Sequence, residues 1–214
     1  MILWLNALML VALAYFCGAL PFGFWAGKWK RIDIREHGSK NIGATNVIRV
    51  LGKRVGVPVF IMDMLKGLLP TMLAQWWMEH LGASPDVASL VAVCCAAATV
   101  LGHMFTFWLG FKGGKGVATS AGAVLGLAPL SLLIAIIVWV VTYYLSRFVA
   151  LASIIAAVFL PIAMVVTMTL QHRWNFVMLG FGIVIGVLVI VRHRANIARL
   201  LSGTENKFEK KKQK

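Results

Sequence analysis

The sequence predicts an all-α integral membrane protein with seven transmembrane helices. Hydrophobic residues make up 60% of the 214 residues and charged residues only 13%, whereas soluble domains average about 45–50% and about 25%. The basic residues gather in three glycine-bearing segments, which we call the first, second and third basic segments: HGSKNIGATNVIRVLGKR (37–54), GFKGGKG (110–116) and RHRANIARLLSGTENK (192–207). Cationic segments between membrane-length apolar runs indicate anion chemistry at one face of a bilayer.

Six apolar runs separate these segments. About 20 apolar residues suffice to cross a bilayer as a helix. The first run carries no basic leader, so we expect a retained span rather than a cleaved signal. The runs lie at residues 2–27, 55–78, 87–102, 117–146, 148–170 and 174–191.

The fourth run is long enough for two helices, and Gly126 with Pro129 can end a helix inside it. Two short spans there make seven crossings and place all three basic segments and Arg147 on one face. One long span would move Arg147 and the third basic segment to the opposite side, against the positive-inside bias. The predicted topology therefore has the N-terminus outside and the C-terminus in the cytoplasm, with short re-entrant or half helices near the cytoplasmic loops.

We expect a single membrane-embedded domain at 1–208 and a basic, disordered tail at 209–214. Asp63 and Lys66 lie three residues apart within the second run, on one helix face. They form either a structural ion pair, which is the favoured interpretation, or an intramembrane functional pair.

The formal net charge of +14 is not accompanied by a nucleic-acid-binding motif. Anionic lipid headgroups and phosphorylated substrates are the expected partners.

The first basic segment combines small residues with neutral donors and a cation. Glycines let a backbone wrap closely around a ligand, and successive N–H groups can form a nest for phosphate oxygens. Ser39, Asn41, Thr45 and Asn46 add donors, and Arg49 adds bidentate charge. The spacing is not that of a Walker motif. A polar loop with ordinary helix caps is the alternative.

The second basic segment places Lys112 and Lys115 around a glycine pair and leads directly into an apolar helix. A helix N-terminus favours anions, so this segment is a second phosphate-site candidate, with a glycine turn and snorkelling lysines as the alternative. His103, just before it, is expected to be a packed or interfacial residue outside the catalytic set.

The third basic segment carries His193, Asn196 and Arg199 at helical spacing, which predicts one shared helix face. A histidine with an asparagine can orient a hydroxyl and accept a proton. Alone this motif is weak evidence for a functional site, because the positive-inside bias already predicts basic residues after the last span.

The sequence lacks an HxxxxD pair, a GxSxG elbow, an HExxH pair and a magnesium-holding aspartate cluster. The catalytic strategies that remain are positioning of the reactants and electrostatic stabilisation, and both suit a substrate that arrives already activated. One alternative hypothesis is a transporter of a phosphorylated metabolite. Another is a lipid-binding scaffold, but a scaffold would leave the two phosphate-like sites unexplained.

Taken together, GSKNIGATNV, GHMFTFWLGFKGGKGVAT and HRANIARLLSGTE resemble, in order and spacing, the three signature motifs of the bacterial acyl-phosphate:glycerol-3-phosphate acyltransferase family, PlsY. The resemblance covers Gly18 to about Phe208. It implies a seven-helix enzyme of the bacterial cytoplasmic (inner) membrane, with its active site facing the cytoplasm. Such an enzyme transfers a fatty acyl group from acyl phosphate to the 1-hydroxyl of glycerol 3-phosphate, giving lysophosphatidic acid and phosphate in the first acylation of phospholipid synthesis. It implies no cofactor, no metal and no direct use of acyl carrier protein or CoA.

The resemblance also implies site residues. Lys40 stands where the family often has glycine, so it receives no role. His193 acts either as a base or by orienting substrate, and orientation is favoured because its motif offers no carboxylate at relay spacing. The implied acyl-phosphate pocket consists of Ser39, Asn41, Gly43 and Thr45; the implied glycerol 3-phosphate site of Arg49, Lys115, Ser153, His193 and Asn196; and the implied catalytic residues are His193, Asn196 and Lys115.

Overall fold

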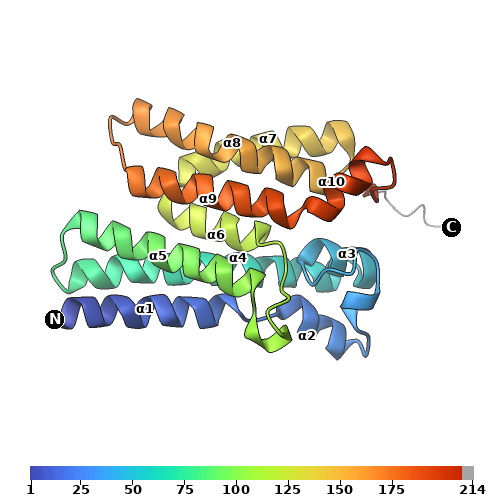
Figure 1. Cartoon of the computed structure of the whole chain (residues 1–214), viewed down its shortest axis with the longest axis horizontal. Coiled ribbons are helices and arrows are strands. Elements are labelled where there is room, and N and C mark those ends of the chain that lie inside the picture. Colours follow the sequence, from blue (N-terminus) through green and yellow to red (C-terminus); the bar gives the residue numbers. More distant parts are fainter. Residues whose placement is uncertain (209–214) are drawn as a thin grey trace. The chain divides into compact units, whose positions relative to one another are not determined.

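The computed structural model describes residues 1–208, whose regular elements are all helices. The chain divides into two compact units, one of residues 1–129 and one that starts at residue 130. The predicted basic tail at 209–214 lies outside the described residues. The all-helical prediction is therefore confirmed for residues 1–208 (Figure 1).

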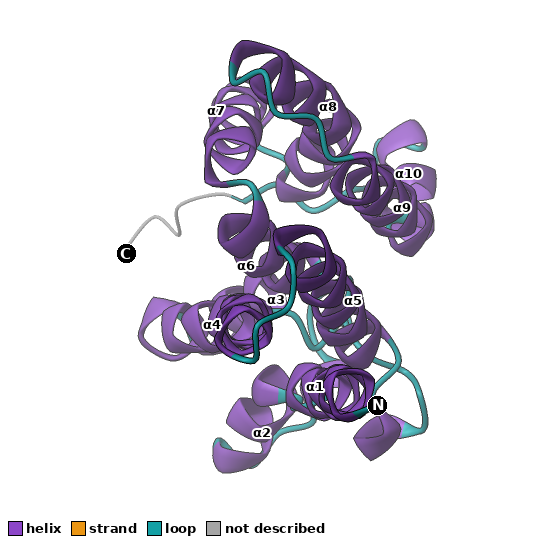
Figure 2. Ribbon diagram, turned by 90° about the vertical axis from the view of Figure 1, so that its left-hand side faces the viewer, coloured by secondary structure: helices purple, strands orange, loops and turns teal. Residues whose placement is uncertain are grey.

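The first unit is built on three long helices that lie side by side, α1, α4 and α5, with α6 packed against α4 and α5 (Figures 1 and 2). Shorter helices carry the basic segments between them. The elements are α1 (Ile2–Gly18), α2 (Phe22–Trp29), the 3-10 turn η1 (Ile34–Glu36), α3 (Ala44–Leu51), α4 (Lys53–His80), α5 (Pro85–Met104), the 3-10 turn η2 (Phe107–Leu109) and α6 (Val117–Leu127).

Glycines allow these helices to touch backbone to backbone. A Cβ added at Gly18 would lie 2.1 Å from the carbonyl oxygen of Thr99, so α1 and α5 meet there without side chains between them. A Cβ at Gly122 would lie 1.9 Å from the carbonyl oxygen of Met64, where α6 meets α4. Small residues at helix contacts are the usual basis of packing in lipid, because lipid supplies no hydrophobic drive between helices.

The second unit contains α7 (Pro129–Ser146), α8 (Val149–Leu170), α9 (Phe176–Arg192) and α10 (Arg194–Leu201). The Ser131 and Thr167 hydroxyls are 2.7 Å apart and join α7 to α8 inside the unit. Helix α10 packs on both α8 and α9. This packing brings the third basic segment against α8, which carries Ser153.

Five stretches of residues 1–208 are long and apolar enough to cross a membrane, and α9 with α10 makes a sixth if the pair counts as one span bent by 57°. The predicted break in the fourth run is confirmed, since α6 ends at Leu127 and α7 begins at Pro129. Helix α6 has 11 residues and is about 16 Å long, roughly half of a hydrocarbon core. The protein is thus a multi-pass helical membrane protein, while the count of seven spans and its orientation stay predictions.

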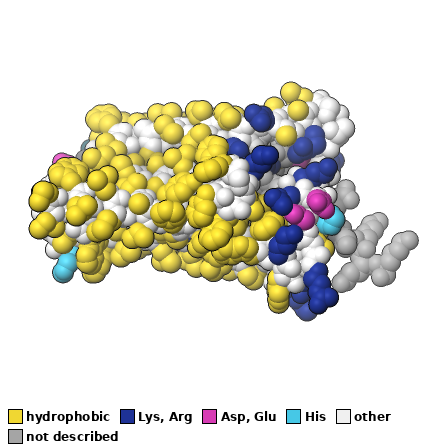
Figure 3. Space-filling view, turned by 60° about the horizontal axis from the view of Figure 1, so that its bottom comes forward, with side chains coloured by type: hydrophobic (Ala, Val, Ile, Leu, Met, Phe, Trp, Pro, Cys, Tyr) yellow, Lys and Arg dark blue, Asp and Glu magenta, His cyan; other side chains and the backbone are white. Residues whose placement is uncertain are grey.

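The surface of the first unit separates apolar from basic side chains. Large apolar side chains such as Leu8 and Phe16 are exposed along α1, whereas the exposed cations Lys28, Lys30 and Arg31 follow at and after the end of α2. Figure 3 shows hydrophobic side chains along the helices and lysines and arginines toward one end. This is the distribution expected where helices leave lipid for an aqueous interface.

Candidate functional site

The buried side chain of Asn46 holds the loop of the first basic segment. Its Oδ1 accepts a hydrogen bond from the backbone N–H of Ser39 at 2.7 Å. Its Nδ2 donates to the carbonyl oxygens of Ile34 (3.2 Å), His37 (3.0 Å) and Asn41 (2.9 Å). A single amide thus uses both its donor and its acceptor capacity on the backbone of residues 34–41, which gives this polar loop a defined shape.

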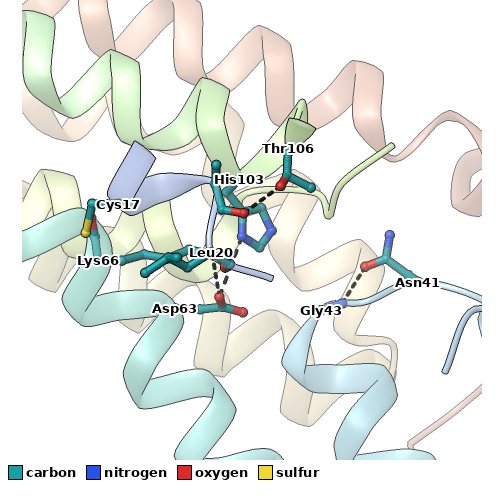
Figure 4. A network of polar contacts seen from close by, with 9 residues as sticks. Cys17, Leu20, Asn41, Gly43, Asp63, Lys66, His103 and Thr106 are labelled. Carbon is teal, nitrogen blue, oxygen red and sulfur yellow. Dashed lines mark hydrogen bonds and ion pairs between the residues drawn. The ribbon is translucent and has the colours of Figure 1, made fainter. Parts of the chain in front are cut away.

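The loop leads directly into the N-terminus of α3. Gly43 is the N-cap residue of this helix, and its N–H donates to Asn41 Oδ1 at 2.8 Å (Figure 4). The half-buried residues Ser39 and Thr45 flank this turn. The first N–H groups of a helix have no partner within the helix and attract anions, so the four residues predicted for the acyl-phosphate pocket lie together at an anion-compatible helix end.

Two arginines of this region have different surroundings. Arg49 lies in the last turn of α3 and is half-buried. Arg35 is exposed, and its guanidinium donates to both carboxylate oxygens of Asp33, at 3.0 and 2.7 Å. These hydrogen bonds from Arg35 hold the pKa of the Asp33 carboxyl well below its usual range, so the charge of Arg35 is largely committed within the loop.

The second basic segment folds back onto the end of α5. The N–H of Gly113 donates to the Met104 carbonyl at 3.0 Å, and the N–H of Gly114 donates to the His103 carbonyl at 3.1 Å. Gly116 has a φ of 81° and is the N-cap residue of α6, a conformation that glycine adopts without strain. The half-buried Lys115 is therefore held directly before a helix N-terminus.

The first and second basic segments are built around one apolar cluster. Leu109 of η2, just before the second segment, packs against the cluster that supports the first segment. The buried members of that cluster are Ile34, Ile42, Ala44, Val47 and Val59. The two phosphate-site candidates of the first unit therefore share a support.

In the third basic segment, His193 marks a bend between two helices. Helix α9 ends at Arg192, α10 begins at Arg194, and their axes differ by 57°. The last apolar helix therefore bends at His193 before it enters the third basic segment. The backbone carbonyl of His193 accepts the first hydrogen bonds of α10, from the N–H groups of Asn196 and Ile197.

The side chain of His193 is buried, and its Nδ1 lies 2.7 Å from the carbonyl oxygen of Val189. A carbonyl only accepts, so Nδ1 carries the proton, and in the neutral ring Nε2 is then the nitrogen able to accept one. The Val189 carbonyl thus orients the ring through Nδ1. This geometry fits substrate orientation as well as base catalysis.

Glu205 contacts two side chains of the third basic segment, although we did not predict it as a site residue from the sequence. Its side chain is 5% exposed. One carboxylate oxygen accepts from Asn196 Nδ2 at 3.0 Å and the other from Arg199 Nε at 2.9 Å. The signal was present as an acidic residue within a basic segment. Its partners depend on the turn after α10, which composition does not reveal.

Ser153 lies buried in α8 of the same unit. Its hydroxyl donates to the Val149 carbonyl at 2.9 Å and accepts from Trp139 Nε1 at 3.1 Å. Of the predicted site residues, the second unit therefore contains Ser153, His193 and Asn196, and the first contains Ser39, Asn41, Gly43, Thr45, Arg49 and Lys115.

These features define a class: a multi-pass helical membrane protein with polar loops suited to phosphate groups. Residues 8–203 match a family model described as glycerol-3-phosphate acyltransferase. Curated proteins with that name are similar over nearly the whole chain. The one from Geobacter sulfurreducens is 45% identical, covering 96% of this chain and 99% of its own length. The one from Fusobacterium nucleatum is 44% identical, covering 93% and 96%.

The chain belongs to the glycerol-3-phosphate acyltransferase family and is an acyltransferase. Two crystal structures of PlsY (YgiH), an integral membrane glycerol 3-phosphate acyltransferase, are also similar to it. The glycerol 3-phosphate form has a TM-score of 0.86 at 42% identity, covering 95% of this chain and 96% of that one. The lysophosphatidic acid form has a TM-score of 0.84 at 41% identity. The resemblance inferred from the three motifs is confirmed.

Proposed function

We propose that this acyltransferase takes its acyl group from an acyl phosphate and transfers it to the 1-hydroxyl of glycerol 3-phosphate, giving lysophosphatidic acid and phosphate. The observation that carries the proposal is the pair of glycine-bearing loops in the first unit, each of which leads into a helix N-terminus. The half-buried cation Arg49 follows the first loop, and the half-buried cation Lys115 lies within the second. Both substrates carry phosphate, so two such loops match two phosphate groups. The forms named for the similar structures, glycerol 3-phosphate and lysophosphatidic acid, support the acceptor and the product.

In this proposal the first loop holds the phosphate of the donor. Ser39, Asn41, Gly43 and Thr45 surround the N-terminus of α3, whose N–H groups suit phosphate oxygens. Asn46 keeps the backbone of this loop in place. In this proposal the helix N-terminus and these neutral donors hold the donor phosphate, and no metal ion takes part.

The proposed acceptor residues combine two cations with neutral side chains. Arg49 and Lys115 offset the charge of the glycerol phosphate, and the hydroxyls of glycerol are oriented by neutral side chains. The residues proposed to hold glycerol 3-phosphate are Arg49, Lys115, Ser153, His193 and Asn196. Lys115, His193 and Asn196 also act at the reacting atoms.

The reaction makes one bond and breaks one. The 1-hydroxyl oxygen attacks the acyl carbon, the bond from that carbon to the phosphate oxygen breaks, and phosphate leaves. The hydroxyl proton passes to His193 Nε2 or to a substrate phosphate oxygen, and orientation by His193 remains the favoured role. Because an acyl phosphate is already activated, bringing the reactants together supplies much of the catalysis.

We further propose that residues 1–208 act as one domain in the bacterial inner membrane, with seven spans and the active site at the cytoplasmic face. The positive-inside bias of the three basic segments supports this orientation.

A turnover assay tests the proposal. Full-length protein in lipid nanodiscs, given palmitoyl phosphate and labelled glycerol 3-phosphate without added metal, is expected to form lysophosphatidic acid and one phosphate per product. Palmitoyl-CoA and palmitoyl-acyl carrier protein serve as control donors and should give no product. Activity with either control donor but none with palmitoyl phosphate would refute the proposed donor.

The family assignment supports acyl transfer over transport of a phosphorylated metabolite. The same preparation in proteoliposomes separates the two hypotheses. Exchange of labelled glycerol 3-phosphate across the membrane without acyl transfer would favour the transporter.

A further inference from the structure

Three buried polar residues of the first unit have no role in the proposed reaction: Asp63 and Lys66 of α4 and His103 of α5. Their side chains are 3%, 3% and 6% exposed. Asp63 Oδ1 lies 2.8 Å from Lys66 Nζ and 3.6 Å from His103 Nδ1, so one oxygen faces both partners (Figure 4). Burying ionisable groups within a membrane segment costs free energy, so such groups usually have a structural or functional role.

Lys66 reaches from this cluster to the break between α1 and α2. Its Nζ donates to the Leu20 carbonyl at 2.8 Å. The Thr106 hydroxyl donates to the neighbouring Ala19 carbonyl. Pro21 cannot donate a backbone hydrogen bond, so the helix is interrupted here and its carbonyls need other donors. Lys66 and Thr106 supply them and so set where α2 begins.

Helix α2 in turn lies directly on the first basic segment. A Cβ added at Gly23 would lie 1.8 Å from the Ile42 carbonyl oxygen and 3.2 Å from the Val47 side chain. With so little space, a shift of α2 is transmitted to the loop that contains Asn41 and Gly43. Lys66 is thus mechanically connected to the proposed acyl-phosphate loop.

His103 extends from the same carboxylate to the second basic segment. Its Nδ1 faces Asp63, while a Cβ at Gly114 would lie 2.1 Å from its Nε2. The His103 carbonyl also accepts the Gly114 N–H at 3.1 Å. The ring is therefore held between Asp63 and the residue before Lys115.

We propose that Asp63, Lys66 and His103 form a buried polar hub that positions both basic segments at once, the first through Lys66 and α2 and the second through His103 and Gly114. The three are positioning residues, acting through the loops rather than on substrate. The hub itself rests on geometry alone, whereas its kinetic consequence rests on the proposed roles of the two loops.

Hydrogen–deuterium exchange of the full-length protein in nanodiscs tests the hub without reference to substrate. In His103→Ala, amides at 105–117 are expected to exchange about tenfold faster, because the ring that packs against Gly114 is lost, with 34–46 unchanged. Asp63→Asn combined with Lys66→Met avoids a lone buried charge and should speed exchange in both segments. Ser131→Ala removes a buried hydrogen bond of the second unit and should leave both segments unchanged.

A cycle of variants tests the contact between His103 and Gly114. Gly114→Ala alone should displace the ring and loosen 105–117, but in the His103→Ala background the added methyl group has room and should have little further effect. If the effects of the two substitutions on exchange were additive, the contact between His103 and Gly114 would not be what positions the second basic segment. Folded variants that show unchanged exchange in both segments would overturn the hub as a whole.

Kinetics then separate the hub from the proposed substrate roles. His103→Ala should raise KM for glycerol 3-phosphate several-fold with a smaller change in kcat, while His103→Gln, which keeps a polar side chain beside Asp63, should recover part of the loss. The neutral pair variant should raise KM for both substrates. Faster exchange with unchanged KM would sustain the hub and refute the roles assigned to the loops.

Discussion

Lys115 and Lys112 are neighbouring cations in one loop with different exposure. Lys115 is half-buried before α6, whereas Lys112 is exposed. If Lys115 binds the phosphate of glycerol 3-phosphate, Lys115→Ala should raise KM for that substrate about tenfold to a hundredfold, as for one charge-assisted hydrogen bond. Lys112→Ala is the matched control and should change KM less than about threefold. Equal effects would indicate a general electrostatic attraction instead of a binding residue.

Glu205 connects two side chains of the third basic segment. Glu205→Ala removes a carboxylate that accepts hydrogen bonds from both Asn196 and Arg199, so kcat/KM should fall at least about tenfold, as for loss of a hydrogen bond to a charged group. Glu205→Gln keeps an acceptor and should lose less. Asn206→Ala, at an exposed neighbour, controls for changes in the turn. Steady-state turnover with both substrates varied measures the effects, and an active Glu205→Ala would show that Asn196 needs no such support.

The candidate site residues were easier to predict from the sequence than the hydrogen-bond partners of their side chains. The donors of the first basic segment and the cations Arg49 and Lys115 stand out by composition and local spacing. The four backbone contacts of Asn46 do not, because they form only when residues 34–41 fold over α3. Glu205 was missed for the same reason.

At the level of elements, the contact between α4 and α6 depends on Gly122. A methyl group there would meet the Met64 carbonyl, so Gly122→Ala should separate the helices and lower stability by about 1–3 kcal/mol. Gly180 of α9 has nothing within 4 Å of an added Cβ. Gly180→Ala is thus the control and should be neutral or slightly stabilising. Thermal unfolding in nanodiscs measures both, and equal unfolding temperatures would contradict this account.

Helix breaks were predicted unevenly. The break between Gly126 and Pro129 was expected from its glycine and proline and is confirmed. The interruption at Gly18–Pro21 has a similar local signal, yet the first run was treated as one span. The bend at His193 has no glycine or proline to announce it and arises where α10 packs on α8 and α9.

For the whole molecule, the crossing of α6 decides the topology. With seven spans, the loops at Gly82 and His172 face the same side, and Lys112 and Asn206 face the other. If α6 does not cross, His172 moves to the side of Lys112. Single cysteines at these four exposed positions, in a background without Cys17, Cys94 and Cys95, should label with an impermeant reagent in cells at 82 and 172 alone. Labelling at 82 but not at 172 would refute seven spans.

The sequence by itself determined the membrane class, the helical content, the break before Pro129 and the family, because hydropathy, charge and motif order are properties of contiguous residues. Only the tertiary structure decided the contacts of Asn46, the bridge through Glu205, the bend at His193 and the cluster of Asp63, Lys66 and His103. Each of these depends on side chains from separate elements. Their positions follow from glycine contacts between helices and from the satisfaction of buried polar groups, which no local pattern specifies.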